Sequence, residues 1–443
     1  MSDHNLTRRD AILTGSAAAL AVMAAAGAQA SLLQPYGNKD KDKDKKKQDA
    51  KAPKEPDLAR LLLPGTRHDW TLKVDIDVNA YVERDSKNMP VVHDFKFDSA
   101  VVVFPVLKGT SSSRSYPTEL KSKLSFNDVL IANVPSGYSE AYPCGTRLGK
   151  WEMSEKTGRE VRLEIDIPMT CWQTKFDEKA AEGVPWPNRW PAVPMSTFND
   201  RQAVGRNREG DEVVLIEHDA PIVQELLKKW TNDKDPKSIP PVVLAKYLAG
   251  QILEYIQPSG NGLWFNKNSG LEGFNLVGAR TALEKRRGTE HDVACALAAI
   301  YRAAGLPARL VIGYDISDEK GKDSNFLAKK PSSVPEFRTW VEFALFLDSA
   351  AKEIWVPVDV NRQRKASSRN TSNWRYFGSN DELENVLPIA HQFHPPTFVM
   401  AHGSPCFWGW VVRPEAQVAT QFLRFDAITT PKTSNSKRDR EKD

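Results

Sequence analysis

Residues 288–314 read GTEHDVACALAAIYRAAGLPARLVIGY, and this stretch decides the fold of the C-terminal half of the chain. Its first half predicts an alanine-rich helix, in which we expect Asp292 to cap the N-terminus or to hold neighbouring backbone. Gly305 and Pro307 then stop the helix and turn the chain. The apolar run 310–314 predicts a strand. A helix, a tight turn and a strand follow from these residues, but no chemistry follows from them alone.

Two segments downstream, RTWVEFALF at 338–346 and WVPVD at 355–359, predict two more strands. Together with 288–314 they resemble the core of the transglutaminase-like superfamily. In that superfamily a helix begins with Gly-x-Cys and ends with Arg-x-x-Gly-[Ile/Leu]-Pro-x-Arg, before a strand that ends with Gly-Tyr. The helix faces two strands, one with the pattern His-x-Trp-Val-Glu and the next with Trp-x-x-Val-Asp. The resemblance implies an α+β fold in which a β-sandwich precedes a papain-like core of helices packed on an antiparallel sheet.

The resemblance also implies where a catalytic triad would lie. The cysteine position falls on Glu290 and the histidine position on Arg338, whereas the aspartate is kept as Asp359. Glutamate is a poor acyl acceptor and arginine stays protonated, so the family's reaction is expected to be lost. Because the two replacements have opposite charges, we predict an ion pair between Glu290 and Arg338, with Asp359 as second partner of Arg338. The alternative is two solvated residues in a decayed cleft.

Two other residues of the helix are weak catalytic candidates. His291 and Cys295 lie four positions apart and share a helix face, so they could form a cysteine–histidine pair. Cys295, however, falls in the second turn, where side chains usually pack. His391, His394 and His402 stand in a proline-rich segment without the spacing of a metal site. We predict neither a metal ion nor a cofactor.

The remaining cysteines leave two alternatives open. Cys144, Cys171, Cys295 and Cys406 are widely separated, with no CxxC pair and no zinc-ligand spacing. A bridge between Cys144 and Cys171 would fit an oxidising compartment. The alternative is four unpaired, mostly buried thiols.

The N-terminus predicts export. Residues 1–30 carry a twin-arginine n-region (TRRDAIL at 7–13), a short alanine-rich apolar run and an Ala-x-Ala cleavage site, so the mature chain would begin near Ser31 in the periplasm or outside the cell. An uncleaved signal anchor is the alternative, and no other transmembrane segment is predicted. The charged stretch 31–60 predicts a disordered linker and 429–443 a disordered tail.

Alternation of apolar and polar residues from Trp70 to Ala80 predicts a half-buried strand. Two further strands at 100–106 and 159–167 extend this to a β-sandwich domain over 64–175. A Pro/Trp-rich connector at 176–215 follows, in which Trp186 and Trp190 either anchor the connector or stack on a ligand. The transglutaminase-like domain would span 216–428, with helices at 220–230 and 240–256 and an irregular segment at 257–277.

Composition narrows the functional classes. The 443-residue chain has a hydrophobic share of 40% and a net charge of +4, with no basic stretch of the kind nucleic-acid surfaces require. Three hypotheses remain. The chain binds a peptide, a cell-wall fragment or a protein partner in a non-catalytic cleft; or it is a hydrolase with Glu290 as general base and Arg338 as anion holder; or it is a cysteine amidase or protease that uses Cys295.

Overall fold

Strand β1 (Leu62–Arg84) shows why the N-terminal half folds as a sheet. From Trp70 to Ala80 its side chains are alternately buried and partly exposed, as the period-two pattern predicts. It pairs antiparallel with β10 (Glu160–Phe176), which repeats the alternation from Val161 onwards. The predicted strands at 70–80, 100–106 and 159–167 are therefore confirmed.

The structure, a computed structural model, describes residues 56–139, 145–206, 212–260, 262–266, 270–316, 336–367, 374–393, 408–414 and 419–429. The signal peptide, the charged linker and the tail predicted from the sequence lie outside these residues, apart from 56–60 at the end of the linker and Thr429 at the start of the tail. Within the described part, no helix is both long and apolar enough to cross a membrane.

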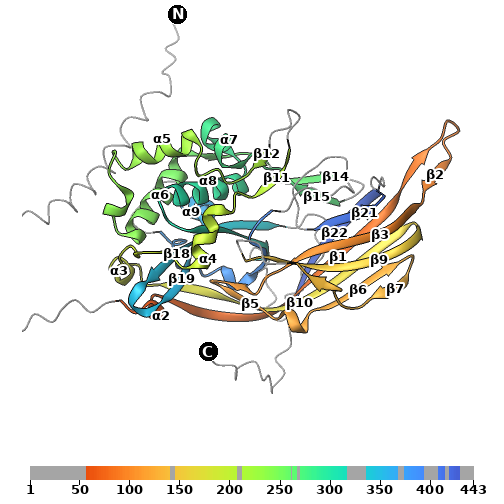
Figure 1. Cartoon of the computed structure of the whole chain (residues 1–443), viewed down its shortest axis with the longest axis horizontal. Coiled ribbons are helices and arrows are strands. Elements are labelled where there is room, and N and C mark those ends of the chain that lie inside the picture. The colour runs from red at the N-terminus through yellow and green to blue at the C-terminus, as the bar shows by residue number, and fades with distance from the viewer. Residues whose placement is uncertain are drawn as a thin grey trace, which may run out of the picture. The chain divides into compact units, whose positions relative to one another are not determined.

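Two antiparallel sheets form the sandwich (Figure 1). Phe97 and Phe126 meet across it with ring centroids 5.8 Å apart, and Phe104 and Phe425 meet at 6.5 Å. The larger sheet contains β1, β10, β2 (Pro90–His93), β4 (Gly109–Thr110), β5 (Ser113–Ser115), β6 (Lys121–Phe126), β7 (Val129–Ala132) and β22 (Ala419–Thr429). The smaller sheet contains β3 (Phe95–Val106), β8 (Gly137–Tyr138), β9 (Arg147–Gly158) and β21 (Gly409–Arg413).

The C-terminal strands correct the predicted domain boundaries. β22 pairs with β1 along its whole length, and β21 pairs with β3. Both strands thus complete the sandwich, although the sequence placed most of their residues in a domain ending at 428. The described residues from 56 to 429 belong to one compact unit, and in it the chain returns to the sandwich with β21 and β22.

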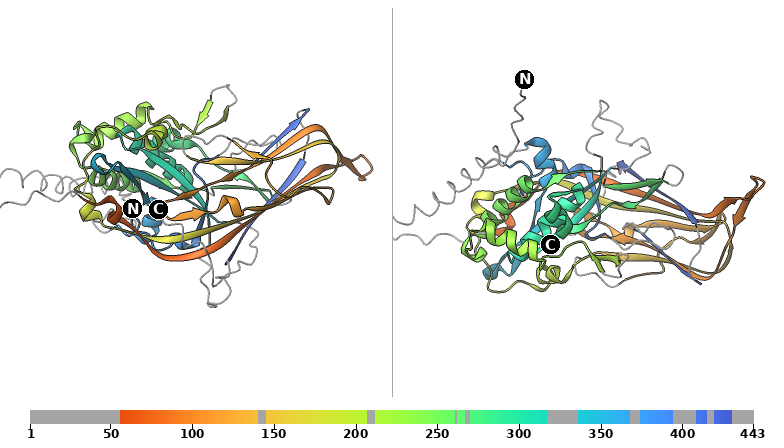
Figure 2. Two further views of the ribbon diagram at one scale, coloured as in Figure 1. Left: turned by 60° about the horizontal axis from the view of Figure 1, so that its bottom comes forward. Right: turned by 90° about the horizontal axis from the view of Figure 1, so that it is seen from above.

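The second half of the fold is a four-stranded antiparallel sheet covered by helices. Its strand order is β19 (Lys352–Val358), β18 (Phe337–Leu347), β17 (Ala308–Asp315) and β20 (Val386–Ala390). The helices are α5 (Pro221–Trp230), α6 (Pro241–Tyr255), α7 (Gly278–Lys285), α8 (Glu290–Ala303) and α9 (Val360–Ala366). Figures 1 and 2 show them gathered at the end of the molecule away from the β2 hairpin. The α+β fold is as predicted.

Helix α8 is the centre of this half. Every residue from His291 to Arg302 is buried, which an alanine-rich helix permits because small side chains let neighbours approach closely on all sides. Tyr301 packs against Phe343 of β18 and donates a hydrogen bond to the carbonyl of Ala245 in α6. The helix is therefore fixed between the sheet and α6.

The long strands β1 and β10 reach from the sandwich to this helical half (Figure 1). Trp70 Nε1 of β1 donates to the carbonyl of Glu384, and Thr174 of β10 exchanges backbone hydrogen bonds with Asn380. Glu342 of β18 accepts hydrogen bonds from the backbone and the hydroxyl of Ser111. These contacts join the two halves directly.

Short elements fill the segments predicted as a connector and as irregular. Trp186 and Trp190 donate to the carbonyls of Ile239 and Gly305, so both indoles anchor the connector to the helical half. The segment 257–277, predicted as irregular, contains a hairpin of β14 and β15. The short elements are α2 (Leu58–Leu61), α3 (Glu178–Ala181), α4 (Ala192–Ser196), β11 (Ala203–Arg206), β12 (Glu212–Val214), β13 (Gln257–Pro258), β14 (Leu263–Asn266), β15 (Gly270–Phe274) and β16 (Arg287–Gly288).

Candidate functional site

The N-terminus of α8 is held by a capping box. Thr289 Oγ1 accepts a hydrogen bond from the backbone of Asp292, and Asp292 Oδ2 accepts one from the backbone of Thr289 at 2.8 Å. The other carboxylate oxygen of Asp292 accepts from the backbone amides of Val277 and Gly278. Burial raises the pKa of Asp292, while these hydrogen bonds oppose that rise. Asp292 caps the helix and holds neighbouring backbone, as predicted.

Glu290, which the sequence comparison predicted at the cysteine position, is the first residue of α8. Its side chain is 46% exposed and forms an ion pair with Lys365 of α9, at 3.3 Å between Oε1 and Nζ. Its carbonyl accepts a hydrogen bond of 2.8 Å from Asn361 Nδ2. The residue thus binds α9 through both its backbone and its side chain.

Arg338 is buried at the start of β18. Its Nε donates to Asp359 Oδ2 at 2.6 Å, and its Nη1 donates to Glu382 Oε2 at 2.9 Å. Asp359 was the predicted partner, but the predicted ion pair with Glu290 is wrong. Both residues are described, and no ion pair joins them, because Asp359 and Glu382 bind the guanidinium while Lys365 binds Glu290.

A buried ionic network surrounds Arg338. Arg362 of α9 binds Asp315 at 2.7 Å and Glu382 at 3.3 Å, and Tyr376 donates its hydroxyl hydrogen to Glu382 at 2.6 Å. Burial and the hydrogen bond to Glu382 raise the pKa of Tyr376 to about 12. Sequence reasoning missed these four residues. Of the four, only Arg362 had a signal in the sequence. A helix that starts after Asp359 brings Arg362, together with Asn361 and Lys365, back towards the predicted triad positions.

A cavity of about 500 Å³ lies where these elements meet. Its walls are residues 258–260, 262 and 263, the first turn of α8, the facing ends of β17 and β18, and α9. Glu290, Arg338 and Asp359 all line it, so the structure brings the three predicted triad positions into one cleft.

The surroundings of His291 and Cys295 do not favour a catalytic pair. Both are buried, and the His291 ring hydrogen-bonds to Thr339 Oγ1 at 2.8 Å and packs against Phe274 and Phe393. Burial lowers the pKa of His291 to about 4. Burial also raises the pKa of Cys295 well above its usual value, which is the opposite of what activates a thiol.

His391 and Cys171 are both buried within the fold. His391 is buried and its Nδ1 lies 3.0 Å from the carbonyl of Leu310. Cys171 is a free, buried thiol. His394, His402, Cys144 and Cys406 lie outside the described residues, and within the described part no cluster of His, Cys, Asp and Glu could hold a metal ion.

The second arginine of the sequence signature serves the scaffold. Arg309 of β17 binds Glu342 of β18 at 2.7 Å and lies over the ring of Trp355, 4.1 Å from its centroid. Arg302, at the end of α8, donates to the carbonyl of Ala308. These residues fix the sheet and the turn, as the structural interpretation of the motif predicts.

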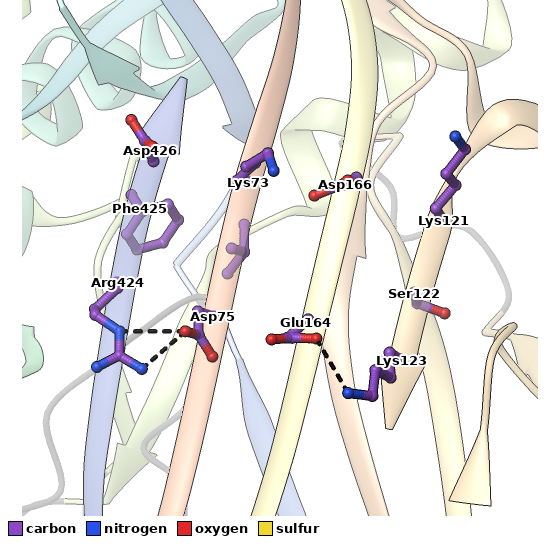
Figure 3. Close-up of a pocket in the computed structure, with 11 residues that line it drawn as sticks. Lys73, Asp75, Lys121, Ser122, Lys123, Glu164, Asp166, Arg424, Phe425 and Asp426 are labelled. Carbon is purple, nitrogen blue, oxygen red and sulfur yellow. Dashed lines mark hydrogen bonds and ion pairs between the residues drawn. The ribbon is translucent and has the colours of Figure 1, made fainter. Parts of the chain in front are cut away.

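A second hollow of about 490 Å³ lies on the larger sandwich sheet (Figure 3). Charged side chains of both signs line it on β22, β1, β10 and β6. Arg424 binds Asp75 at 2.8 Å, and Lys123 binds Glu164 at 3.9 Å. Such cross-strand pairs stabilise a solvated sheet face, so we place the candidate site in the cleft at α8 instead.

No curated protein matches this chain in sequence. Among solved structures it is similar to a candidate cysteine protease from Cytophaga hutchinsonii, with 12% identity, a TM-score of 0.45, and 83% of this chain and 93% of that chain covered. Red sea bream transglutaminase shows 11% identity and a TM-score of 0.26, with 60% and 50% covered. A candidate protease from Parabacteroides distasonis shows 10% identity and a TM-score of 0.21, with 66% and 58% covered.

The family model of the transglutaminase-like superfamily matches residues 252–360. This range contains α8, β17, β18 and β19 and ends just past Asp359. Residues 252–360 are therefore a transglutaminase-like core, and the cleft lies at its helix N-terminus.

Proposed function

We propose that this chain is an exported transglutaminase-like protein that does not perform the family's cysteine chemistry and uses the cleft at α8 to bind a peptide segment. One observation carries the proposal. The helix that would present a nucleophile begins with Glu290, which is ion-paired to Lys365, in a cavity of about 500 Å³. The cleft is present, and the cysteine of the helix, Cys295, is buried and does not line it.

The electrostatics of Arg338 support the loss of acid–base chemistry. Burial by itself lowers the pKa of Arg338, but the Coulombic attraction of Asp359 and Asp315 raises it above its ordinary value. A guanidinium that stays protonated cannot take a proton from a nucleophile. Arg338 also binds two carboxylates already, which argues against a role as the holder of an anionic substrate.

The accessible charges of the cleft favour a ligand with groups of both signs. Glu290 and Lys365 are 46% and 57% exposed, and Glu336 is exposed at the rim. An exposed ion pair contributes little to stability, so a ligand can exchange it for its own charges at small cost. A peptide, from a cell-wall fragment or from a protein partner, carries such groups together with backbone amides.

Binding is tested with saturation-transfer NMR on a set of synthetic tetrapeptides and on soluble cell-wall peptides. We expect the saturation-transfer signals of the bound peptides to disappear in Glu290→Lys, which reverses the accessible charge. The signals should persist in Glu164→Lys, a matched change on the sandwich face. Equal binding by wild type and Glu290→Lys would place the ligand elsewhere.

Catalysis is tested on the same protein with a panel of amide and ester substrates. We expect no turnover. Turnover that Glu290→Gln abolishes would identify a hydrolase with Glu290 as general base, and turnover that Cys295→Ala abolishes would identify a cysteine enzyme.

Export is supported by the twin-arginine segment and is tested by cell fractionation. We expect the wild-type chain outside the cytoplasmic membrane, and retention inside when Arg8→Lys and Arg9→Lys are combined. A pair of variants exported as well as wild type would refute this route.

A further inference from the structure

Two buried polar atoms in the wall of the cleft at α8 have no hydrogen-bond partner among the described residues. They are Nη2 of Arg338 and Oδ1 of Asn361, and the two residues are only 5% and 6% exposed. Both residues line the cavity of about 500 Å³. None of the residues described around the hollow on the larger sandwich sheet has such an atom. The cleft therefore carries buried hydrogen-bonding capacity that the chain itself does not use.

The contacts of the two side chains show why these atoms remain. Arg338 directs Nε to Asp359 and Nη1 to Glu382, which leaves Nη2. Asn361 donates from Nδ2 to the carbonyl of Glu290. Because a carbonyl oxygen only accepts hydrogen bonds, this contact fixes which end of the amide is Nδ2, and Oδ1 is the atom left over. The cleft thus holds one unused donor and one unused acceptor.

This combination restricts the chemical groups that fit the cleft. A buried polar atom without a partner is costly, so a ligand that supplies the partners gains binding free energy. A carboxylate only accepts hydrogen bonds and leaves Oδ1 of Asn361 unsatisfied, whereas an ammonium group only donates and leaves Nη2 of Arg338 unsatisfied. A neutral group that both accepts and donates serves both atoms. The main chain of a peptide has this property, since each residue other than proline carries one N–H and one C=O.

We infer that one residue of an extended peptide is held in the cleft by its main chain, with its C=O accepting from Nη2 of Arg338 and its N–H donating to Oδ1 of Asn361. This inference rests on the proposed function and names the part of the peptide that the cleft recognises. The N–H and C=O of one residue in an extended chain point to the same side, as they do in an antiparallel ladder. The contact does not depend on the side chain of the held residue.

Access to Asn361 is coupled to the exposed ion pair of the cleft. Lys365 lies four residues after Asn361 on the same face of α9, and both residues contact Glu290. A peptide that exchanges the Glu290–Lys365 pair for its own charges therefore opens the space beside Asn361. The exposed charges select the peptide, and its main chain then reaches the two buried atoms.

Replacement of single peptide groups tests the inference. The tetrapeptide with the strongest saturation-transfer signal is synthesised with an ester in place of each amide in turn, which removes one N–H. A second series places a thioamide at each C=O, because sulfur is a weaker acceptor. We expect one ester to raise the dissociation constant about 10-fold, and the thioamide of the same residue to raise it too. The two scans should therefore point to a single residue of the peptide.

A variant of the protein identifies the partner of the N–H. In Asn361→Ala the ester and amide forms should bind within about 2-fold of each other, because the acceptor is gone. Asn385→Ala is the matched control, at a buried asparagine that does not line the cavity, and there the difference of about 10-fold should remain. Circular dichroism checks that each variant is folded.

The outcomes separate this inference from the proposed function. If no ester weakens binding, or if the weakening persists in folded Asn361→Ala, the inference is wrong while the proposed function stands. The two scans use the wild-type chain alone, so scans that point to different residues overturn the inference without any variant. If no tetrapeptide binds, the proposed function fails and the inference fails with it.

Discussion

Replacing Arg338 by methionine tests the buried ionic network at the residue predicted to take the histidine position. The guanidinium side chain is 5% exposed, and its partner Asp359 is 1% exposed. After the change, Asp359 keeps the hydrogen bond from the backbone of Arg362 but loses its charged partner. Removing one member of a buried pair typically costs about 3–5 kcal/mol, because the remaining charge is left uncompensated.

The assay is urea unfolding at pH 7, followed by far-ultraviolet circular dichroism. The control is Lys365→Met, which breaks the exposed pair with Glu290 and should cost less than about 1 kcal/mol. The double variant Arg338→Met/Asp359→Asn should lose at least about 1 kcal/mol less unfolding free energy than the two single variants lose together, because the two residues are coupled. A cost for Arg338→Met as small as that for Lys365→Met would refute the network.

Three other changes probe the rest of the account. Iodoacetamide at pH 8 should leave Cys171 and Cys295 unmodified until urea unfolds the chain, because burial raises the pKa of both thiols. Mass spectrometry of the peptides measures the labelling, and a thiol labelled in the folded chain would contradict the account. The pKa of His291 falls from 6.5 to about 4 on folding, so the unfolded chain binds the extra proton between these pH values. The free energy of unfolding should therefore decrease by on the order of 3 kcal/mol as the pH drops from 6.5 to 4, and His291→Asn should make this decrease smaller. An unchanged pH dependence in His291→Asn would be evidence against the assignment. Truncation after residue 407 removes β21 and β22 and should abolish cooperative unfolding of the sandwich, whereas a sandwich domain complete by residue 175 would survive it.

The parts of the fold that follow from local pattern were predictable from the sequence. The alternation around Trp70, the capping role of Asp292 and the stop at Gly305 each depend on neighbours within a few residues. The pairing of Arg338 with Asp359 was also predictable, because adjacent strands of a recognised core place them together.

What failed depends on contacts between distant residues. Glu382 reaches Arg338 from a segment after α9, and Lys365 reaches Glu290 from within α9, so the partner that each charge takes is decided by tertiary packing. The strands β21 and β22 likewise return to β3 and β1 across more than half of the chain, and no local signal marks that return.

The central claim is that the cleft keeps the family's framework while residues 290 and 338 remove its chemistry. It is tested most directly by combining Glu290→Cys with Arg338→His in a chain that also carries Cys295→Ala, and by measuring the pH dependence of alkylation at position 290. The account predicts that the new thiol reacts at a pH well below its usual range, because the helix N-terminus and a histidine held by Asp359 stabilise the thiolate. The control carries Glu290→Cys and Cys295→Ala but keeps Arg338. The same pH dependence of alkylation in the control and in the variant with Arg338→His would contradict the account.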